Sequence, residues 1–121
     1  MKKENLLELK DEISKLKKSD KLIIVEGKKD IIALNNLGIK NTIEINDSLE
    51  LFSEKIAKNN KEIILLTDLD NEGKKIYSKL NHYLSQQGVK IDNSFRNFLF
   101  KKTKLTQIEG LDKYIEYIIC N

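Results

Sequence analysis

Carboxylates follow two of the most apolar segments of the chain. Glu26 comes directly after the run Leu22–Val25. Asp68 and Asp70 follow a second run, Ile63–Leu66. Two carboxylates about 4 Å apart repel each other by roughly 4 kcal/mol at an effective dielectric constant near 20. A divalent cation turns this repulsion into attraction, and carboxylate oxygens suit hard ions such as Mg²⁺. If the two segments lie side by side, the three carboxylates form a candidate metal site.

The acidic turn after the second run also has an ordinary structural interpretation. Asp and Asn are common in turns, and acids near the start of a helix complement its dipole. One helix cap needs one acid, whereas this turn holds three, Asp68, Asp70 and Glu72. The crowding therefore favours a cation site, while the structural interpretation stays open.

The elements that must position these acids alternate between strands and helices. Continuous apolar runs are typical of strands buried on both faces of a parallel sheet. Such alternation predicts an α/β fold, a three-layer Rossmann-like parallel sheet of about four strands with right-handed crossovers. Ligands bind such sheets at the carboxyl ends of the strands, where the acids are placed. Strands are expected at 22–25, 41–46, 63–66 and 89–91, and helices around 3–18, 31–37, from 49 to near 59–60, behind Gly73, around 95–99 and around 111–118.

Two local features lie outside this alternation. Asp47 and Glu50 form a pair that resembles a capping box and predicts the start of the third helix. The segment Gln107–Gly110 has the composition of a loop.

Composition limits the class of protein. With 121 residues, 40% of them hydrophobic and 34% charged, the chain fits one globular domain. Its longest apolar runs are about four residues, against the roughly 20 of a membrane span. Met1–Glu8 lacks the apolar core of a signal peptide, and the single cysteine, Cys120, excludes an internal disulfide or a multi-cysteine zinc site. We therefore expect a cytoplasmic protein without a membrane partner.

The charge pattern gives only weak guidance about partners. The net charge of +3 favours an anionic partner slightly. Lysines are spread along the whole chain, with the densest cluster at Lys101, Lys102 and Lys104. Arg96 is the only arginine, so we expect no arginine forks that read phosphates or base edges.

Two motifs resemble the signatures of the Toprim domain. They are V-E-G-K-K-D at 25–30 and T-D-L-D-N-E-G at 67–73, and the resemblance covers about residues 20–92. This domain is shared by type IA and type II topoisomerases, bacterial-type primases, certain nucleases and the ribonuclease that matures 5S ribosomal RNA. With its N-terminal helix and I-E-G-L-D at 108–112, the whole chain resembles a family of small stand-alone Toprim proteins of archaea.

The resemblance implies a domain organisation and a role for each acid. It divides the chain into an amphipathic N-terminal helix at 1–19, a Toprim core at 20–92 and a helical extension at 93–121. Glu26 is expected to be a metal ligand or a general acid/base for the leaving oxygen. Asp68 and Asp70 are expected to hold one or two Mg²⁺ ions, with Mn²⁺ as a substitute. The supporting residues around these ligands are expected to be Gly27, Asp30, Glu72 and Gly73.

The implied activity is Mg²⁺-dependent phosphodiester chemistry on RNA or DNA, with a nuclease as the leading interpretation. A topoisomerase needs a nucleophilic tyrosine from another domain, and a primase usually carries a zinc ribbon that one cysteine cannot build. A protein partner could supply the substrate specificity. The alternative is a non-catalytic nucleic-acid-binding or assembly module that keeps the metal site for structure. A nucleotide-binding domain is disfavoured because no G-x-G-x-x-G or P-loop sequence is present.

Overall fold

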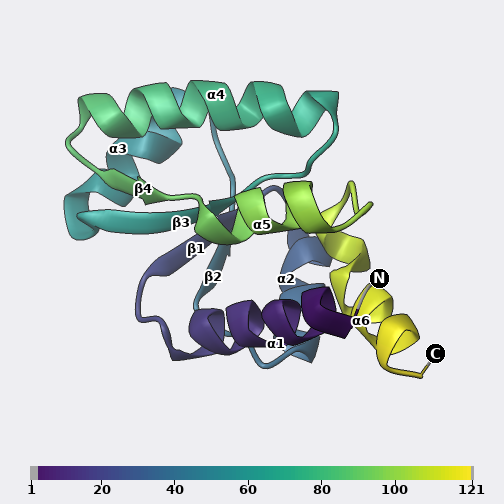
Figure 1. The fold of residues 1–121 in the computed structure, drawn as a ribbon. Coiled ribbons are helices and arrows are strands. Elements are labelled where there is room, and N and C mark those ends of the chain that lie inside the picture. The colour runs from purple at the N-terminus through teal and green to yellow at the C-terminus, as the bar shows by residue number, and fades with distance from the viewer. Residues whose placement is uncertain (1–2, 121) are drawn as a thin grey trace.

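A four-stranded parallel sheet lies at the centre of the protein (Figure 1). The computed structural model describes residues 3–120, so residues 1, 2 and 121 of the expected terminal segments lie outside the described part. The strand order is β2-β1-β3-β4, and every neighbouring pair is parallel. The predicted α/β fold is therefore confirmed. The strands are β1 (Leu22–Val25), β2 (Thr42–Glu44), β3 (Glu62–Leu66) and β4 (Lys90–Asp92).

Helices cover both faces of this sheet, which gives three layers (Figure 1). One face packs against α3 and α4, and the other packs against α1, α2, α5 and α6. The C-terminal helices thus share a core with the sheet. The helices are α1 (Lys3–Lys18), α2 (Lys28–Asn36), α3 (Leu49–Asn59), α4 (Asn71–Gln86), α5 (Ser94–Lys102) and α6 (Leu111–Cys120), and a 3-10 turn, η1 (Ile108–Gly110), precedes α6.

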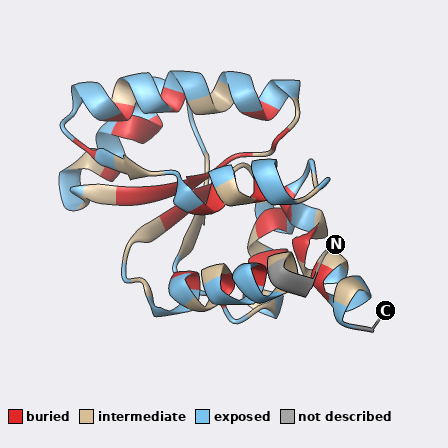
Figure 2. Cartoon of the chain, in the orientation of Figure 1, coloured by how far each residue is buried: buried red, intermediate tan, exposed pale blue. Residues whose placement is uncertain are grey.

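The two central strands are buried on both sides because their residues alternate between two cores. Ile23 and Val25 of β1 face the core that contains α1 and α5, whereas Ile24 faces the core that contains α3 and α4. In β3, Ile64 and Leu66 join the first core, with Ile63 and Leu65 in the second. Figure 2 shows β1 and β3 as largely buried. This is why both strands read as continuous apolar runs.

The expected capping pair at the start of α3 is wrong. Ser48 caps this helix, and its hydroxyl accepts the N–H of Leu51 at 3.3 Å. Asp47 lies one residue earlier with a φ of 62°, and its carboxylate pairs with Lys55. Ser and Asp are equally good caps, so the choice between adjacent residues depends on where the chain turns.

Within residues 3–120, no helix combines the length and the apolar composition needed to cross a membrane.

Candidate functional site

The carboxylates of Glu26 and Asp68 meet at the carboxyl ends of the two central strands. Val25 of β1 pairs with Leu66 of β3, so the residues that follow leave the sheet at the same edge. Glu26 Oε2 accepts the backbone N–H of Asp68 at 2.6 Å, and the charge of Asp68 raises the pKa of the Glu26 carboxyl. The structure thus brings together two acids that are 42 positions apart in the sequence.

Asp70 is the N-cap of α4. Its Oδ1 accepts the N–H of Gly73 at 2.8 Å, which places Gly73 inside the first turn of the helix rather than before it. Asp70 therefore has the ordinary structural role that an acid in this turn can have. Its charge still raises the pKa of both Glu26 and Asp68, so it belongs to the same electrostatic cluster.

Burial and like charges make this cluster bind protons strongly. Burial raises the pKa of Glu26 to about 7, and the charges of Asp68, Asp30 and Asp70 act in the same direction. Burial also raises the pKa of Asp30 to about 6 and that of Asp68 above its usual value. The folded protein is therefore more stable when each of these groups is protonated, or has a cation next to it, than when it is an unpaired carboxylate.

The donor chemistry of this cluster fits Mg²⁺. One oxygen of each of Glu26, Asp68 and Asp70 accepts a backbone N–H, and the other can face a cation. Among the described side chains, no three Asp, Glu, His or Cys groups already stand at metal-binding distance. Mg²⁺ commonly keeps several waters and binds proteins through one or two carboxylates. Glu26 and Asp68 are therefore the two carboxylates that could hold such an ion.

Two glycines support the acidic turns in different ways. A Cβ on Gly73 would stand 2.0 Å from the carbonyl oxygen of Asp68, so only glycine lets the turn pack this closely on α4. The hydroxyl of Thr67 fixes the same contact by donating to the Gly73 carbonyl at 2.9 Å. Gly27 is the N-cap of α2, and its N–H donates to the carboxylate of Asp30 at 3.1 Å.

The two remaining acids of the motifs differ in their surroundings. Asp30 is buried, with 5% of its surface exposed, and its pKa shift shows that it senses the charge of Asp68. Glu72 is exposed in the first turn of α4, where its charge complements the helix dipole. The structure thus brings Asp30 to the cluster and leaves Glu72 on the surface.

Arg96 is a central residue of the site that the sequence analysis missed. It is buried on α5, and its guanidinium donates to the carbonyls of Thr67 and Asp68 at 3.1 and 3.0 Å. The guanidinium also lies over the ring of Tyr77, 4.5 Å from its centre. Arg96 therefore holds the backbone of the acidic turn and adds a positive charge behind it. Its status as the single arginine of a lysine-rich chain was the available signal.

The segment before α6 forms a further wall of the site. The N–H of Ile108 donates to Asp68 Oδ1 at 2.8 Å, and the N–H of Leu69 donates to the carbonyl of Thr106 at 2.7 Å. These two hydrogen bonds hold the segment before α6 against the turn that contains Asp68. The sequence analysis treated this segment as a loop, although its I-E-G-L-D motif contributed to the family resemblance.

Glu26, Asp30 and Asp68 line an open hollow of about 510 Å³, whereas Asp70 does not line it. Lys28 and Lys29, the first two residues of α2, also line it. Glu109 of η1 lines the hollow from the opposite side. The hollow is thus lined by both acidic and basic side chains.

Comparison with known proteins identifies the family. A family model described as the Toprim domain matches residues 20–93. The chain belongs to the Toprim family. The matched part contains both acidic motifs and all four strands of the sheet.

Similar Toprim chains occur in archaea. The protein is 38% identical over 116 residues to a UPF0292 protein of Methanosarcina acetivorans, a match that covers 93% of this chain and 81% of the relative. It is 32% identical over 117 residues to a UPF0292 protein of Methanocaldococcus jannaschii, with 93% and 91% covered. The resemblance to small stand-alone archaeal Toprim proteins is confirmed.

A solved structure of a protein from Aquifex aeolicus has the same fold. The two structures superpose with a TM-score of 0.77 and share 37% sequence identity, over 84% of this chain and 96% of the other. The Toprim fold described above is therefore also present in an experimentally solved relative.

Proposed function

We propose that this protein is a Mg²⁺-dependent enzyme that cuts phosphodiester bonds in RNA or DNA. The observation that carries the proposal is the hydrogen bond between the Glu26 carboxylate and the backbone N–H of Asp68, which brings the ends of β1 and β3 together at the carboxyl edge of the sheet. Two partly buried carboxylates favour a divalent cation between them when the charge of one raises the pKa of the other, as the charge of Asp68 does for Glu26, and the Toprim family gives the class of reaction. The expected cytoplasmic location stays a prediction.

The side chains of the cluster have separate roles in this proposal. In hydrolysis, a water oxygen bonds to phosphorus while the bond from phosphorus to the leaving oxygen breaks, and the leaving oxygen takes a proton. Glu26, with a pKa of about 7, can give that proton to the leaving oxygen at neutral pH and regain one from the attacking water. Mg²⁺ held by Glu26 and Asp68 would supply neutralisation of phosphate charge and of the charge that develops on the leaving oxygen. Glu26 would then serve as a ligand of the ion in place of its role in proton transfer.

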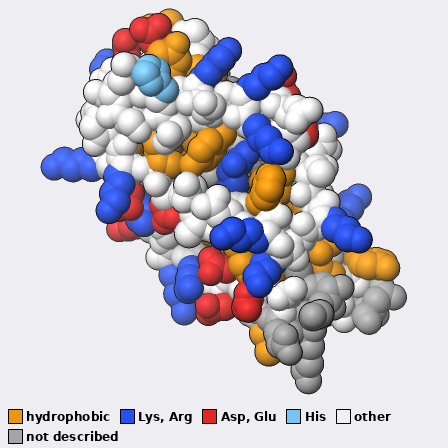
Figure 3. Space-filling view, turned by 45° about the horizontal axis from the view of Figure 1, so that its top comes forward, with side chains coloured by type: hydrophobic (Ala, Val, Ile, Leu, Met, Phe, Trp, Pro, Cys, Tyr) orange, Lys and Arg blue, Asp and Glu red, His pale blue; other side chains and the backbone are white. Residues whose placement is uncertain are grey.

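The residues around the acids bind and orient. The N–H of Ile108 and the guanidinium of Arg96 hold the carboxylate and the backbone of Asp68, which keeps its second oxygen directed to one place. Lys28 and Lys29 attract phosphate to the hollow. On the face shown in Figure 3, by contrast, basic side chains are scattered among hydrophobic and acidic ones. Because scattered basic side chains give little selectivity among nucleic acids, the proposal includes a separate protein partner that supplies the substrate specificity.

The test is cleavage of labelled structured RNA and single-stranded DNA with Mg²⁺ and with EDTA. Asn at position 68 can still accept the Ile108 N–H, and Asn at position 70 is as good a cap as Asp. Asp68→Asn and Asp70→Asn therefore remove charge without removing the hydrogen bonds of the fold. We expect a loss of about 100-fold or more for Asp68→Asn. The control is Glu54→Gln, which neutralises an exposed acid on α3.

Two results would contradict the proposal. One is full activity in the Asp68→Asn variant, which would place the chemistry elsewhere. The other is the absence of Mg²⁺-dependent cleavage for every substrate tested, alone or with cell extract.

A non-catalytic module is the second candidate, and one observation favours it. Asp70 already acts as the cap of α4, and no third acid completes a metal site within the described residues. Such a protein would bind nucleic acid in a Mg²⁺-dependent way without turnover. Its affinity would fall equally with salt for every sequence, because phosphate contacts would supply the binding energy.

A further inference from the structure

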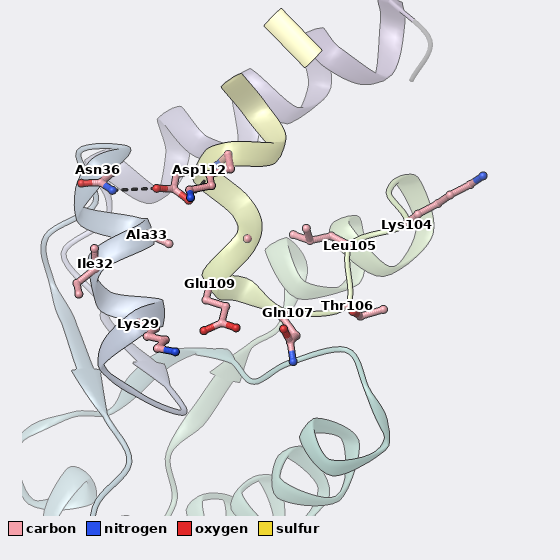
Figure 4. A pocket seen from close by; sticks show the side chains of 12 residues that line it. Lys29, Ile32, Ala33, Asn36, Lys104, Leu105, Thr106, Gln107, Glu109 and Asp112 are labelled. Carbon is pink, nitrogen blue, oxygen red and sulfur yellow. Dashed lines mark hydrogen bonds between the residues drawn. The ribbon is translucent and has the colours of Figure 1, made fainter. Parts of the chain in front are cut away.

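A larger cleft opens beside the acidic hollow, between α2 and the segment 104–113 (Figure 4). Its volume is about 640 Å³, which is within the range of sites that hold small organic groups. Lys29, Gln107 and Glu109 line both the cleft and the acidic hollow. The two therefore form one continuous depression that leads to Glu26 and Asp68.

Apolar side chains contribute to both walls of the cleft. Ile32 and Ala33 of α2 lie on one side, and Leu105 lies on the other (Figure 4). Ile32 is 59% exposed, although its neighbours in α2, Ala33 and Leu34, are buried. An exposed β-branched residue at the side of a concave site offers a surface for a flat apolar group.

The polar groups of the cleft suit a nucleotide. Lys29 and Lys113 supply positive charge for a phosphate. Of the two acids, Glu109 lies near Lys29 in Figure 4, and Asp112 already accepts a hydrogen bond from the Asn36 amide at 2.8 Å. Gln107 provides an amide that can donate to and accept from the edge of a base.

We propose that this cleft binds an unpaired nucleotide next to the phosphate that reacts in the acidic hollow. The inference rests on the proposed function and names its substrate class as single-stranded nucleic acid, or a duplex with an unpaired end. A base within a duplex is stacked and paired, so it cannot enter a concave site without being extruded. An unpaired base can pack on Ile32 and Leu105 while its phosphate meets Lys29.

The experiment measures binding by fluorescence anisotropy with Mg²⁺, using three probes of one sequence: a single strand, a blunt duplex and a duplex with a single-stranded overhang. Gel electrophoresis checks that the probes stay intact. Ile32→Asp places a charge among the apolar side chains of the cleft. Leu51→Asp is its matched control, because Leu51 is 51% exposed and lies on α3. Lys113→Gln and Lys79→Gln, the latter on α4, form a second pair.

We expect the single strand and the overhang duplex to bind about tenfold more tightly than the blunt duplex. Ile32→Asp should weaken binding of the single strand about tenfold, and Leu51→Asp by less than about twofold. Lys113→Gln should weaken binding more than Lys79→Gln does. The probe comparison uses the unaltered protein, and thermal unfolding shows whether each variant is folded.

Different failures have different meanings. Equal affinity for the three probes, or equal effects within each matched pair, would overturn the cleft proposal, even if Mg²⁺-dependent cleavage were observed. A lack of binding to every probe together with a lack of cleavage would overturn both the cleft proposal and the proposed function.

Discussion

Replacement of Glu26 by Gln should make the metal-free protein more stable at neutral and alkaline pH. Burial raises the pKa of the Glu26 carboxyl from 4.5 to about 7, so ionising this group destabilises the folded state. A shift of roughly 2.5 units corresponds to about 3 kcal/mol. Solvent screens a carboxyl that is only partly buried, and we therefore expect about 1–2 kcal/mol.

The sign of the pH dependence follows from linkage. A carboxyl whose pKa is raised by folding binds its proton more tightly in the folded state. Its contribution to stability is complete below the unfolded pKa near 4.5 and is lost as the pH rises through about 7. Asp30, with a pKa of about 6, and Asp68, whose pKa is also raised, act in the same direction. The metal-free protein should therefore lose stability from about pH 4 to pH 8.

The assay is urea unfolding in EDTA, followed by circular dichroism across that pH range. The Gln side chain keeps an oxygen that can accept the Asp68 N–H. The variant should therefore show a shallower decline than the wild type and be about 1–2 kcal/mol more stable at pH 8. Glu54→Gln, on the exposed face of α3, should follow the wild type. A Glu26→Gln variant that is less stable than the wild type at pH 8, or has the same slope, would refute the electrostatic reasoning.

Three further predictions concern the same turn. Gly73→Ala should destabilise the protein by about 1–3 kcal/mol or more in urea unfolding, because its Cβ would overlap the Asp68 carbonyl; unchanged stability would show that the turn can move. Arg96→Met should lower the free energy of unfolding by about 2–4 kcal/mol, because two carbonyls lose their donors. Arg96→Lys should recover part of this loss, and equal losses in the two variants would assign the effect to packing. Mg²⁺ at 100 times its dissociation constant should raise the free energy of unfolding of the wild type by about 2.7 kcal/mol, and that of Glu26→Gln by less. A melting temperature that does not change with Mg²⁺ in either protein would argue against a cation site.

Local sequence patterns were sufficient to predict the sheet and its helices. The runs at 22–25 and 63–66 are central strands because both faces of each are covered, and a continuous apolar run is the direct consequence. Neighbouring parallel strands then bring the residues after them to one edge, so the meeting of Glu26 and Asp68 could be predicted without coordinates.

The parts that were missed depend on contacts between distant segments. Arg96 reaches the carbonyls of Thr67 and Asp68 across 29 and 28 positions, and no periodicity within α5 reports this. The Ile108 N–H bonds to Asp68 across 40 positions, also from a segment with no regular pattern. Asp70 shows a different limit of sequence analysis. An aspartate at this position can be a helix cap or a metal ligand, and the sequence alone cannot separate the two roles.

Anomalous diffraction from a crystal soaked in Mn²⁺ tests the central claim most directly. The account predicts a peak at coordination distance from the carboxylates of Glu26 and Asp68, with Asp70 nearby, and the loss of this peak in Asp68→Asn. A soaked crystal that shows no density between these two carboxylates, or shows Mn²⁺ only elsewhere on the protein, would contradict it.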